Sequence, residues 1–171
     1  MIWFKFIKSI IRVLSSNISP KQISGAVVLG LFIGLNPYFT LHSLVFLVLI
    51  YFLQVHVATA FLSIAIWKII GYLVDPLSHA IGYWLLVKID SLNPFWTNLY
   101  NTSIIPFTKF YNTVVLGSFV ISLILTIPVF IFCQKFIVFY RANVRKKVEN
   151  LKIVKLFKLS NIYKIYSRFK G

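Results

Sequence analysis

Residues 114–133, VVLGSFVISLILTIPVFIFC, form a predominantly apolar run without a formal charge. Such a run of about 20 residues, rising 1.5 Å per residue as a helix, covers about 30 Å, the thickness of the hydrocarbon core of a bilayer. We therefore expect it to cross a membrane as a helix, with Pro128 bending it near its end. Ser118, Ser122 and Thr126 recur every four residues and form one small face, which we expect to pack against another helix.

The composition of the whole chain agrees with a membrane protein. Of its 171 residues 59% are hydrophobic and 12% are charged, whereas soluble domains are about 45–50% apolar and about a quarter charged. Its 18 Lys and Arg against 3 Asp and Glu give a net charge of +15. On a soluble chain that charge would indicate nucleic-acid binding, but the apolar excess favours the anionic cytoplasmic face of a membrane. We therefore expect one membrane domain that binds anionic lipid and no nucleic acid.

Basic residues are concentrated at the two ends of the chain. Four lie in residues 1–21 and eleven in residues 135–171, while residues 22–67 carry no formal charge. Because cytoplasmic segments of membrane proteins carry an excess of Lys and Arg, both termini are predicted to be cytoplasmic and the number of crossings to be even. The chain then divides into a basic amphipathic helix at 1–17, one helical transmembrane domain at 18–134 and a basic amphipathic tail at 135–171.

The first charge-free run begins with a helix signal and contains a helix break. Residues 19–22, SPKQ, supply an N-cap Ser, a Pro at the first helical position and a Gln at the third, so a helix is predicted over about 20–35. Asn36 and Pro37 end it, and a second helix is predicted over about 40–53. Two half-length helices joined by a break indicate a re-entrant hairpin, and two short, tilted crossings are the competing interpretation.

The first of these helices has a face of small residues. Ala26, Gly30 and Gly34 lie four residues apart, so one side of the helix is nearly bare backbone. A neighbouring helix can approach such a side closely.

A further crossing is predicted over residues 57–74, which contain one charge, Lys68. Asp75 and Pro76 are expected to end this helix, because Pro disfavours a helical conformation for the residue before it and Asp caps the helix that follows. The next helix is too short to cross and is predicted to lie at the membrane interface, followed by a connecting layer rich in Asn, Thr, Pro, Trp and Tyr. The expected order is therefore helices at about 57–74, 77–88 and 112–134, with the connecting layer at 89–112.

The tail alternates basic and apolar residues. This pattern predicts an amphipathic helix in the plane of an anionic leaflet, and RNA binding is the weaker alternative because it would leave the apolar residues in water. The side chains expected to contact lipid headgroups are Lys146, Lys147, Lys152, Lys155 and Lys158.

Few side chains in the core of the chain could carry chemistry. His42 follows the helix break and could line a polar cavity with Asn36 and Thr40, or be a hydrogen-bonded packing residue. Lys68 could meet Asp75 along one helix face, or extend its ammonium group to the headgroups. Asp75 and His79, four residues apart, could supply two ligands of a metal site, but a structural metal needs three or four ligands. We therefore prefer Asp75 as an N-cap. We assign no catalytic residue, metal or cofactor, and Cys133 is expected to be a buried apolar residue.

Several motifs resemble a known family. The run from Ser19-Pro20 through residues 30–34, GLFIG, to Pro37 and His42 is similar to the signature of small bacterial inner-membrane proteins known only as a domain of unknown function. Residues 75–77, DPL, Gly82-Tyr83 and residues 99–118, LYNTSIIPFTKFYNTVVLGS, resemble one uncharacterised subfamily. The resemblance covers nearly all of residues 17–130. It implies a location in the bacterial cytoplasmic membrane and no established activity. The all-α, polytopic fold is predicted from the helical segments themselves.

Two classes of function fit these features. The first is a non-enzymatic membrane anchor or partner subunit in envelope assembly or lipid traffic. In this role the chain would associate with another envelope protein or with a second copy of itself through its small-residue faces. The second is a small transporter or lipid-handling unit that uses the Asn36-Pro37 break and Lys68, because transporters place their sites at interrupted helices. An enzyme is disfavoured because no nucleophile with a base can be assembled, and the absence of an internal repeat favours the partner role.

Overall fold

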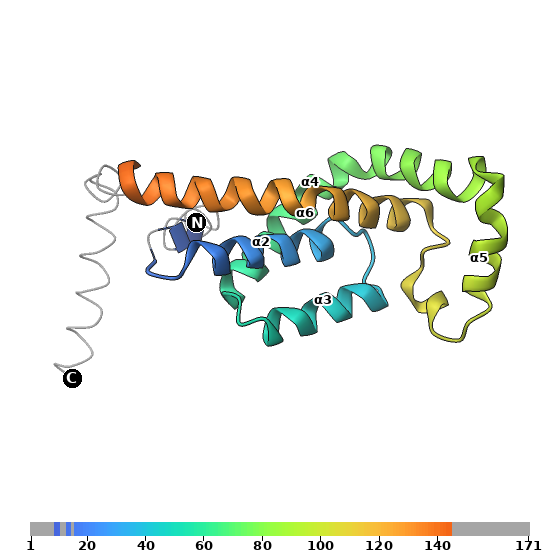
Figure 1. Ribbon diagram of the computed structural model, residues 1–171, viewed down its shortest axis with the longest axis horizontal. Helices are drawn as coiled ribbons and strands as arrows, with labels where there is room; N and C mark the ends of the chain where they lie inside the picture. The colour runs from blue at the N-terminus through green and yellow to red at the C-terminus, as the bar shows by residue number, and fades with distance from the viewer. Residues whose placement is uncertain (1–8, 11–12, 15, 145–171) are drawn as a thin grey trace, which may run out of the picture.

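The computed structural model describes residues 9–10, 13–14 and 16–144, and this part of the chain contains helices and turns but no strand. The all-α fold expected from the sequence is thus confirmed. Of the five α-helices in residues 16–144, α2, α3, α4 and α6 run along one long axis and α5 lies across it at one end, while α2 begins and α6 ends towards the opposite end (Figure 1). Their bounds are α2 Pro20–Gly34, α3 Leu41–Phe52, α4 Val57–Tyr83, α5 Asn93–Tyr100 and α6 Thr113–Phe139.

The helix α2 begins where the sequence predicts. Ser19 is the N-cap, its Oγ accepts a hydrogen bond from the backbone N–H of Gln22 at 3.2 Å, and Pro20 occupies the first turn. The Gln22 side chain does not form the usual capping-box bond to the N-cap backbone, because its Oε1 accepts from the Ser19 hydroxyl at 3.1 Å. Its Nε2 donates to the carbonyl of Gln54 at 3.4 Å. This contact ties the start of α2 to the residues that follow α3.

The two short helices α2 and α3 form a hairpin. At 15 and 12 residues they are about 22 and 18 Å long, which is less than the thickness of a bilayer core. The hairpin is closed by a stack of Phe32 on Phe46, whose ring centroids are 4.1 Å apart. A core cluster joins both helices to α4, and its buried members are Ala26, Leu29, Ile50 and Ala60.

Two helical segments, Val57–Lys88 and Thr113–Asn143, are long and apolar enough to cross a membrane. The first segment is longer than the helix predicted from the sequence. The helix α4 continues through Asp75 and Pro76 to Tyr83, and a π-helical turn, Trp84–Lys88, follows it. The predicted end of the helix at residue 74 and the separate helix at 77–88 are therefore wrong. A single Pro removes one backbone donor, and a long apolar helix packed against neighbours tolerates this loss.

Asp75 consequently lies inside α4 and is not an N-cap. The helix α6 likewise continues through Pro128 to Phe139, five residues beyond the predicted end. Between α4 and α6, residues 89–112 contain only short helical pieces, which include 3₁₀ turns at Asp90–Leu92 and Ile105–Thr108 in addition to α5. This connection does not form a further long helix.

The helix α2 runs parallel to α4 and packs against both α4 and α6. A Cβ added to Gly30 would lie 2.6 Å from Ser63 Cβ, and one added to Gly34 would lie 2.5 Å from Trp67 Cβ. Both distances are shorter than ordinary van der Waals contact, so α2 and α4 touch through the bare side of α2.

The helices α4 and α6 cross even more closely, with opposite directions. A Cβ on Gly117 would lie 1.8 Å from the carbonyl oxygen of Ser78, and one on Gly82 would lie 1.9 Å from that of Thr113. Beside this crossing, Ser118 and Ser122 are 1% exposed and donate to carbonyl oxygens of α6 itself.

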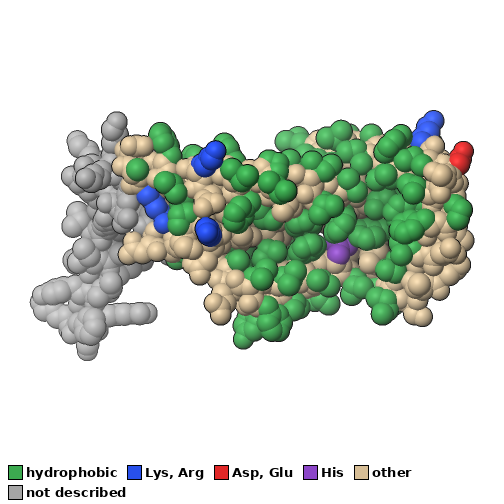
Figure 2. All heavy atoms as spheres, in the orientation of Figure 1, with side chains coloured by type: hydrophobic (Ala, Val, Ile, Leu, Met, Phe, Trp, Pro, Cys, Tyr) green, Lys and Arg blue, Asp and Glu red, His purple; other side chains and the backbone are tan. Residues whose placement is uncertain are grey.

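The surface of the described residues is largely apolar along the middle of the molecule. Figure 2 shows basic side chains near the end where α2 begins and α6 ends, and a basic and an acidic side chain at the opposite end, with hydrophobic side chains between them. Exposed apolar residues of α3, α4 and α6 contribute to this region, among them Leu44, Tyr51, Leu73, Leu123 and Ile127.

The predicted amphipathic ends fall mostly outside the described residues. Of residues 1–17, positions 9–10 and 13–14 are helical. The headgroup-binding residues assigned to the tail, Lys146, Lys147, Lys152, Lys155 and Lys158, all lie beyond residue 144, where the structure describes nothing.

Candidate functional site at the break of the helical hairpin

The break between α2 and α3 carries a cluster of buried polar side chains. The helix α2 ends at Gly34, the Leu35 N–H bonds to the Leu31 carbonyl, and α3 begins at Leu41. The cluster lies on and beside the intervening segment: Asn36 is 2% exposed, Thr40 4%, His42 8% and Ser43 1%. Burial of polar groups costs free energy unless they are hydrogen-bonded, so this cluster must be joined internally.

Thr40 is the centre of the cluster. Its Oγ1 lies 3.1 Å from Asn36 Nδ2, 3.0 Å from His42 Nδ1 and 3.1 Å from Ser43 Oγ. Asn36 Nδ2 also makes a hydrogen-bond contact with His42 Nε2. One arrangement of hydrogens satisfies all these contacts: Asn36 Nδ2 donates to His42 Nε2 and to Thr40, His42 Nδ1–H donates to Thr40, and the Thr40 hydroxyl donates to Ser43.

One atom of the cluster lacks a partner. Asn36 Oδ1 is buried and has no hydrogen-bond partner within the described part of the chain. An amide oxygen can accept two hydrogen bonds, so this atom offers a buried acceptor to a water molecule or another donor.

The backbone of the break is held by Lys68 of α4. Its Nζ donates to the carbonyl oxygens of Asn36 at 2.6 Å and of Pro37 at 2.9 Å. These carbonyls follow the C-terminal end of α2, where the helix dipole is negative and a cation is stabilised. Neither interpretation made from the sequence, pairing with Asp75 or extension to the headgroups, identified these partners.

Aromatic side chains from a distant part of the chain cover the break. The His42 ring stacks on Phe110 with centroids 5.2 Å apart, and Phe119 of α6 meets it edge-on at 5.4 Å. Beside them, Lys109 Nζ lies 5.4 Å from the ring centroid of Tyr38. The backbone of Lys109 is left-handed, with φ of 57°, and this conformation turns the chain from the connecting layer towards α6.

The other polar residues predicted from the sequence lie away from this cluster. His79 Nδ1 is 2.7 Å from Thr113 Oγ1 at the crossing of α4 and α6, and Asp75 is one helical turn before it. No group of three or more His, Cys, Asp or Glu among the described residues could hold a metal ion. The hairpin break thus brings together Asn36, Pro37, His42 and Lys68, while His79 belongs to a different contact, with Thr113.

Sequence reasoning missed the residues that cover and pack the site. Phe110 and Phe119 lie more than 60 residues after His42, and nothing in their local pattern links them to it. For Gly82 and Gly117 a weak signal was available, since glycine inside a helix is unfavourable and indicates close packing.

Comparisons with known proteins agree with the family resemblance. A family model described as "Uncharacterized protein conserved in bacteria (DUF2062)" matches residues 5–146. An uncharacterized protein of Treponema pallidum (strain Nichols) is 23% identical over 145 residues, which cover 85% of this chain and 89% of the relative. No solved structure matches the chain.

Proposed function

We propose that this chain, which belongs to the DUF2062 family of uncharacterized bacterial proteins, is a multi-pass protein of the bacterial inner membrane. In this proposal α4 and α6 cross the bilayer, and the α2–α3 hairpin enters from the cytoplasmic side and turns back within it. The observation that carries the proposal is the covered helix break, where Lys68 and aromatic side chains satisfy and shield irregular backbone between two half-length apolar helices. Irregular backbone is tolerated at membrane depth where protein covers it.

The depth of the break supports this arrangement. Lys68 lies about 16 Å along α4 from its first residue, Val57, which is about half the thickness of a bilayer core. The start of α2 and the end of α6 lie at the same end of the bundle, and they bear Lys21 and Lys135. Since basic residues favour the cytoplasm, that end and both chain termini face inwards in the proposed topology.

Within the membrane, we assign the protein a non-enzymatic role as an anchor or partner subunit in envelope assembly or lipid traffic. The hairpin-break cluster consists of amide, hydroxyl and imidazole groups joined to one another, an arrangement suited to holding the break rather than to activating a nucleophile. The exposed apolar face of α3 offers a surface for a partner in the bilayer, and its largest side chains include Tyr51 and Phe52.

A second candidate, a small transporter or lipid-handling unit, is favoured by one specific observation. The buried Asn36 Oδ1 lacks a partner at a helix break, which is where transporters coordinate their substrates. If this atom binds a substrate, Asn36→Asp should alter transport or growth while Ser43→Ala leaves both intact. Equal and unchanged growth and transport in the two variants would remove this candidate.

The proposed topology is tested by labelling single cysteines with a membrane-impermeant maleimide. In a Cys133→Ser background, Gln54→Cys should react only from the cytoplasmic side and Asn98→Cys only from the outside. Tyr38→Cys, at the hairpin break, should react from neither side until the membrane is dissolved. Labelling of Tyr38→Cys from the outside would show two full crossings and refute the hairpin.

The partner role is tested separately in cells. A photo-crosslinking residue placed at Tyr51 should give a discrete crosslinked product that contains a second envelope protein or a second copy of this chain. The same residue at Asn98, in the proposed external layer, is the matched control. If the position-51 protein yields only monomer in cells and after purification in mild detergent, the partner role is wrong.

A further inference from the structure

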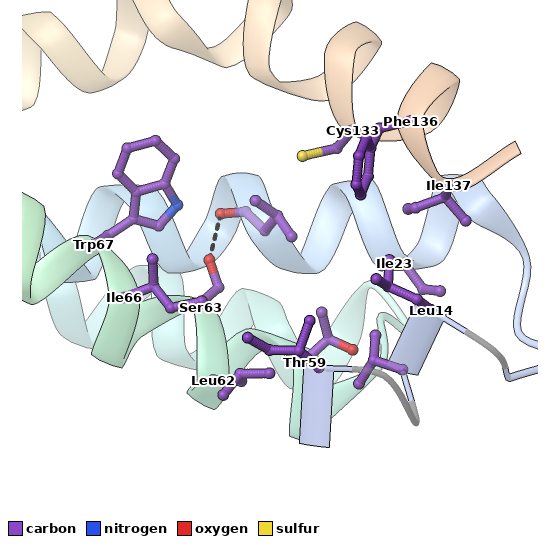
Figure 3. Close-up of a pocket in the computed structure, with 13 residues that line it drawn as sticks. Leu14, Ile23, Thr59, Leu62, Ser63, Ile66, Trp67, Cys133, Phe136 and Ile137 are labelled. Atoms are coloured by element: carbon purple, nitrogen blue, oxygen red, sulfur yellow. Dashed lines mark hydrogen bonds between the residues drawn. The ribbon is translucent and has the colours of Figure 1, made fainter. Parts of the chain in front are cut away.

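An apolar cavity lies between the start of α2, the start of α4 and the end of α6. Its volume is about 240 Å³, and the N-terminal residues Ile10, Val13 and Leu14 line one side (Figure 3). Each of the three helices contributes apolar side chains: Ile23 and Val27 from α2, Leu62 and Trp67 from α4, and Cys133 and Ile137 from α6.

The two hydroxyl groups of the lining, those of Ser63 and Thr59, are already engaged. Ser63 Oγ donates to the Val27 carbonyl at 3.0 Å, the bond drawn in Figure 3. Thr59 Oγ1 lies 2.6 Å from His56 Nδ1, which precedes α4. An occupant of the cavity therefore gains little from hydroxyl or amide groups, and apolar cavities of this size stay dry and bind apolar molecules.

The position of the cavity matches one leaflet of a bilayer. It extends along α4 from Thr59 to Trp67, about 12 Å, and the hydrocarbon of one leaflet is about 15 Å thick. At this end of the bundle Lys21 lies in the first turn of α2 and Lys135 near the end of α6, while Arg141 donates from Nε to the carbonyl of Leu14, one of the lining residues, at 3.1 Å. The apolar cavity is thus adjacent to cationic side chains.

We propose that this cavity binds an acyl chain of an anionic phospholipid from the cytoplasmic leaflet, with the headgroup beside the basic end of the bundle. The inference rests on the proposed membrane topology and names the ligand class that a role in lipid traffic requires. The apolar lining selects the hydrocarbon chain, and the charge at the end of the helices selects an anionic headgroup over a zwitterionic one.

The test uses the full-length protein in vesicles that contain phosphatidylglycerol with a photoactivatable diazirine in one acyl chain. After illumination and digestion, crosslinked lipid should be enriched on the α6 peptide that contains Cys133, relative to peptides from the exposed face of α3. Replacement of the probe by the phosphatidylcholine analogue should reduce this enrichment. Equal enrichment with both headgroups would overturn the anionic preference.

Filling the cavity provides the decisive comparison. Cys133→Trp places a large ring in the cavity and should abolish crosslinking there, whereas Leu123→Trp, on an exposed part of α6, should leave it intact. If Cys133→Trp does not fold, Val27→Phe replaces it, with the exposed Val45→Phe as its control.

Unchanged crosslinking in a folded cavity-filling variant would overturn the proposal, as would uniform labelling of all lipid-facing peptides. Recovery of a peptide of another protein from the cavity, in place of lipid, would also overturn it. These results are distinguishable from failure of the proposed topology, because the impermeant-maleimide pattern at Gln54→Cys and Asn98→Cys is measured independently, on the single-cysteine variants in vesicles of the same composition.

Discussion

Replacing Lys68 with Met removes the ammonium group that holds the hairpin break and keeps a side chain of similar length. The native Nζ donates to the Asn36 and Pro37 carbonyls at 2.6 and 2.9 Å. Hydrogen bonds to a charged group contribute about 1.5–3 kcal/mol each, so the pair sets an upper range of about 3–6 kcal/mol. Because Lys68 is only partly buried, we expect Lys68→Met to lower the free energy of unfolding by about 3 kcal/mol, the lower end of this range.

A loss of this size changes the ratio of unfolded to folded protein by about 100-fold, which is well within measurement. The assay is reversible unfolding in mixed detergent micelles, followed by circular dichroism, with the exposed Lys88→Met as the control, in the π-helical turn that follows α4. Lys68→Arg keeps a cationic donor and should retain part of the stability. A second readout is the Tyr38→Cys thiol, whose labelling should rise when the break is released.

The reasoning would be refuted if Lys68→Met unfolded within about 0.5 kcal/mol of the unmodified protein, the range of ordinary surface substitutions, without increased labelling at position 38. That result would mean that water or lipid satisfies the two carbonyls equally well. Loss of cellular function with unchanged stability would instead favour Lys68 as part of a transport site.

Two further substitutions probe the packing of the helices. Gly117→Val should destabilise the protein by about 3 kcal/mol or prevent folding, because its Cβ would lie 1.8 Å from the Ser78 carbonyl oxygen. The control is Gly25→Ala, whose Cβ would meet a side-chain methyl of Val55 at 3.3 Å. This control should lower the free energy of unfolding by less than about 1 kcal/mol in the same assay. Ser24→Ala should be neutral or stabilising by up to about 1 kcal/mol, because Ser24 Oγ is buried without a hydrogen-bond partner in the described structure; a loss above about 1 kcal/mol in thermal unfolding would show that a water molecule binds there.

Local signals in the sequence were sufficient for the helix that leads into the site. Ser19 and Pro20 begin α2 as predicted, because an N-cap side chain and a fixed φ act within one turn. The break at Asn36-Pro37 was also predicted from the sequence, since Pro disfavours a helical backbone conformation for the residue before it. The polar residues Asn36 and His42 could be proposed as neighbours because only a few residues separate them.

The same local rule failed at Asp75 and Pro76. There α4 continues, because its crossing with α6 at Gly117 and Gly82 holds the helix after the Pro, and the packing of Gly71 against the end of α2 holds it before the Pro. This tertiary stabilisation outweighs the loss of one backbone hydrogen bond, and it depends on residues about 40 positions away. The cover that Phe110 gives to His42 is non-local in the same way, so neither could be derived from spacing along the chain.

The small-residue stripes bear on where a partner could bind. The sequence suggested that Gly34 of α2 and Ser118 of α6 serve contacts with a partner, but in the fold Gly34 contacts Trp67 and Ser118 is 1% exposed beside the crossing of α4 and α6. A second protein cannot use a surface that the chain's own helices already cover. A partner in the membrane must therefore contact large exposed side chains such as Tyr51 of α3, where association rests on van der Waals packing of bulky groups rather than on close backbone approach. Substitutions on the two kinds of surface should therefore have different effects: changes at Gly34 reduce stability, whereas Phe52→Ala reduces partner crosslinking from the probe at position 51 and leaves the unfolding free energy nearly unchanged.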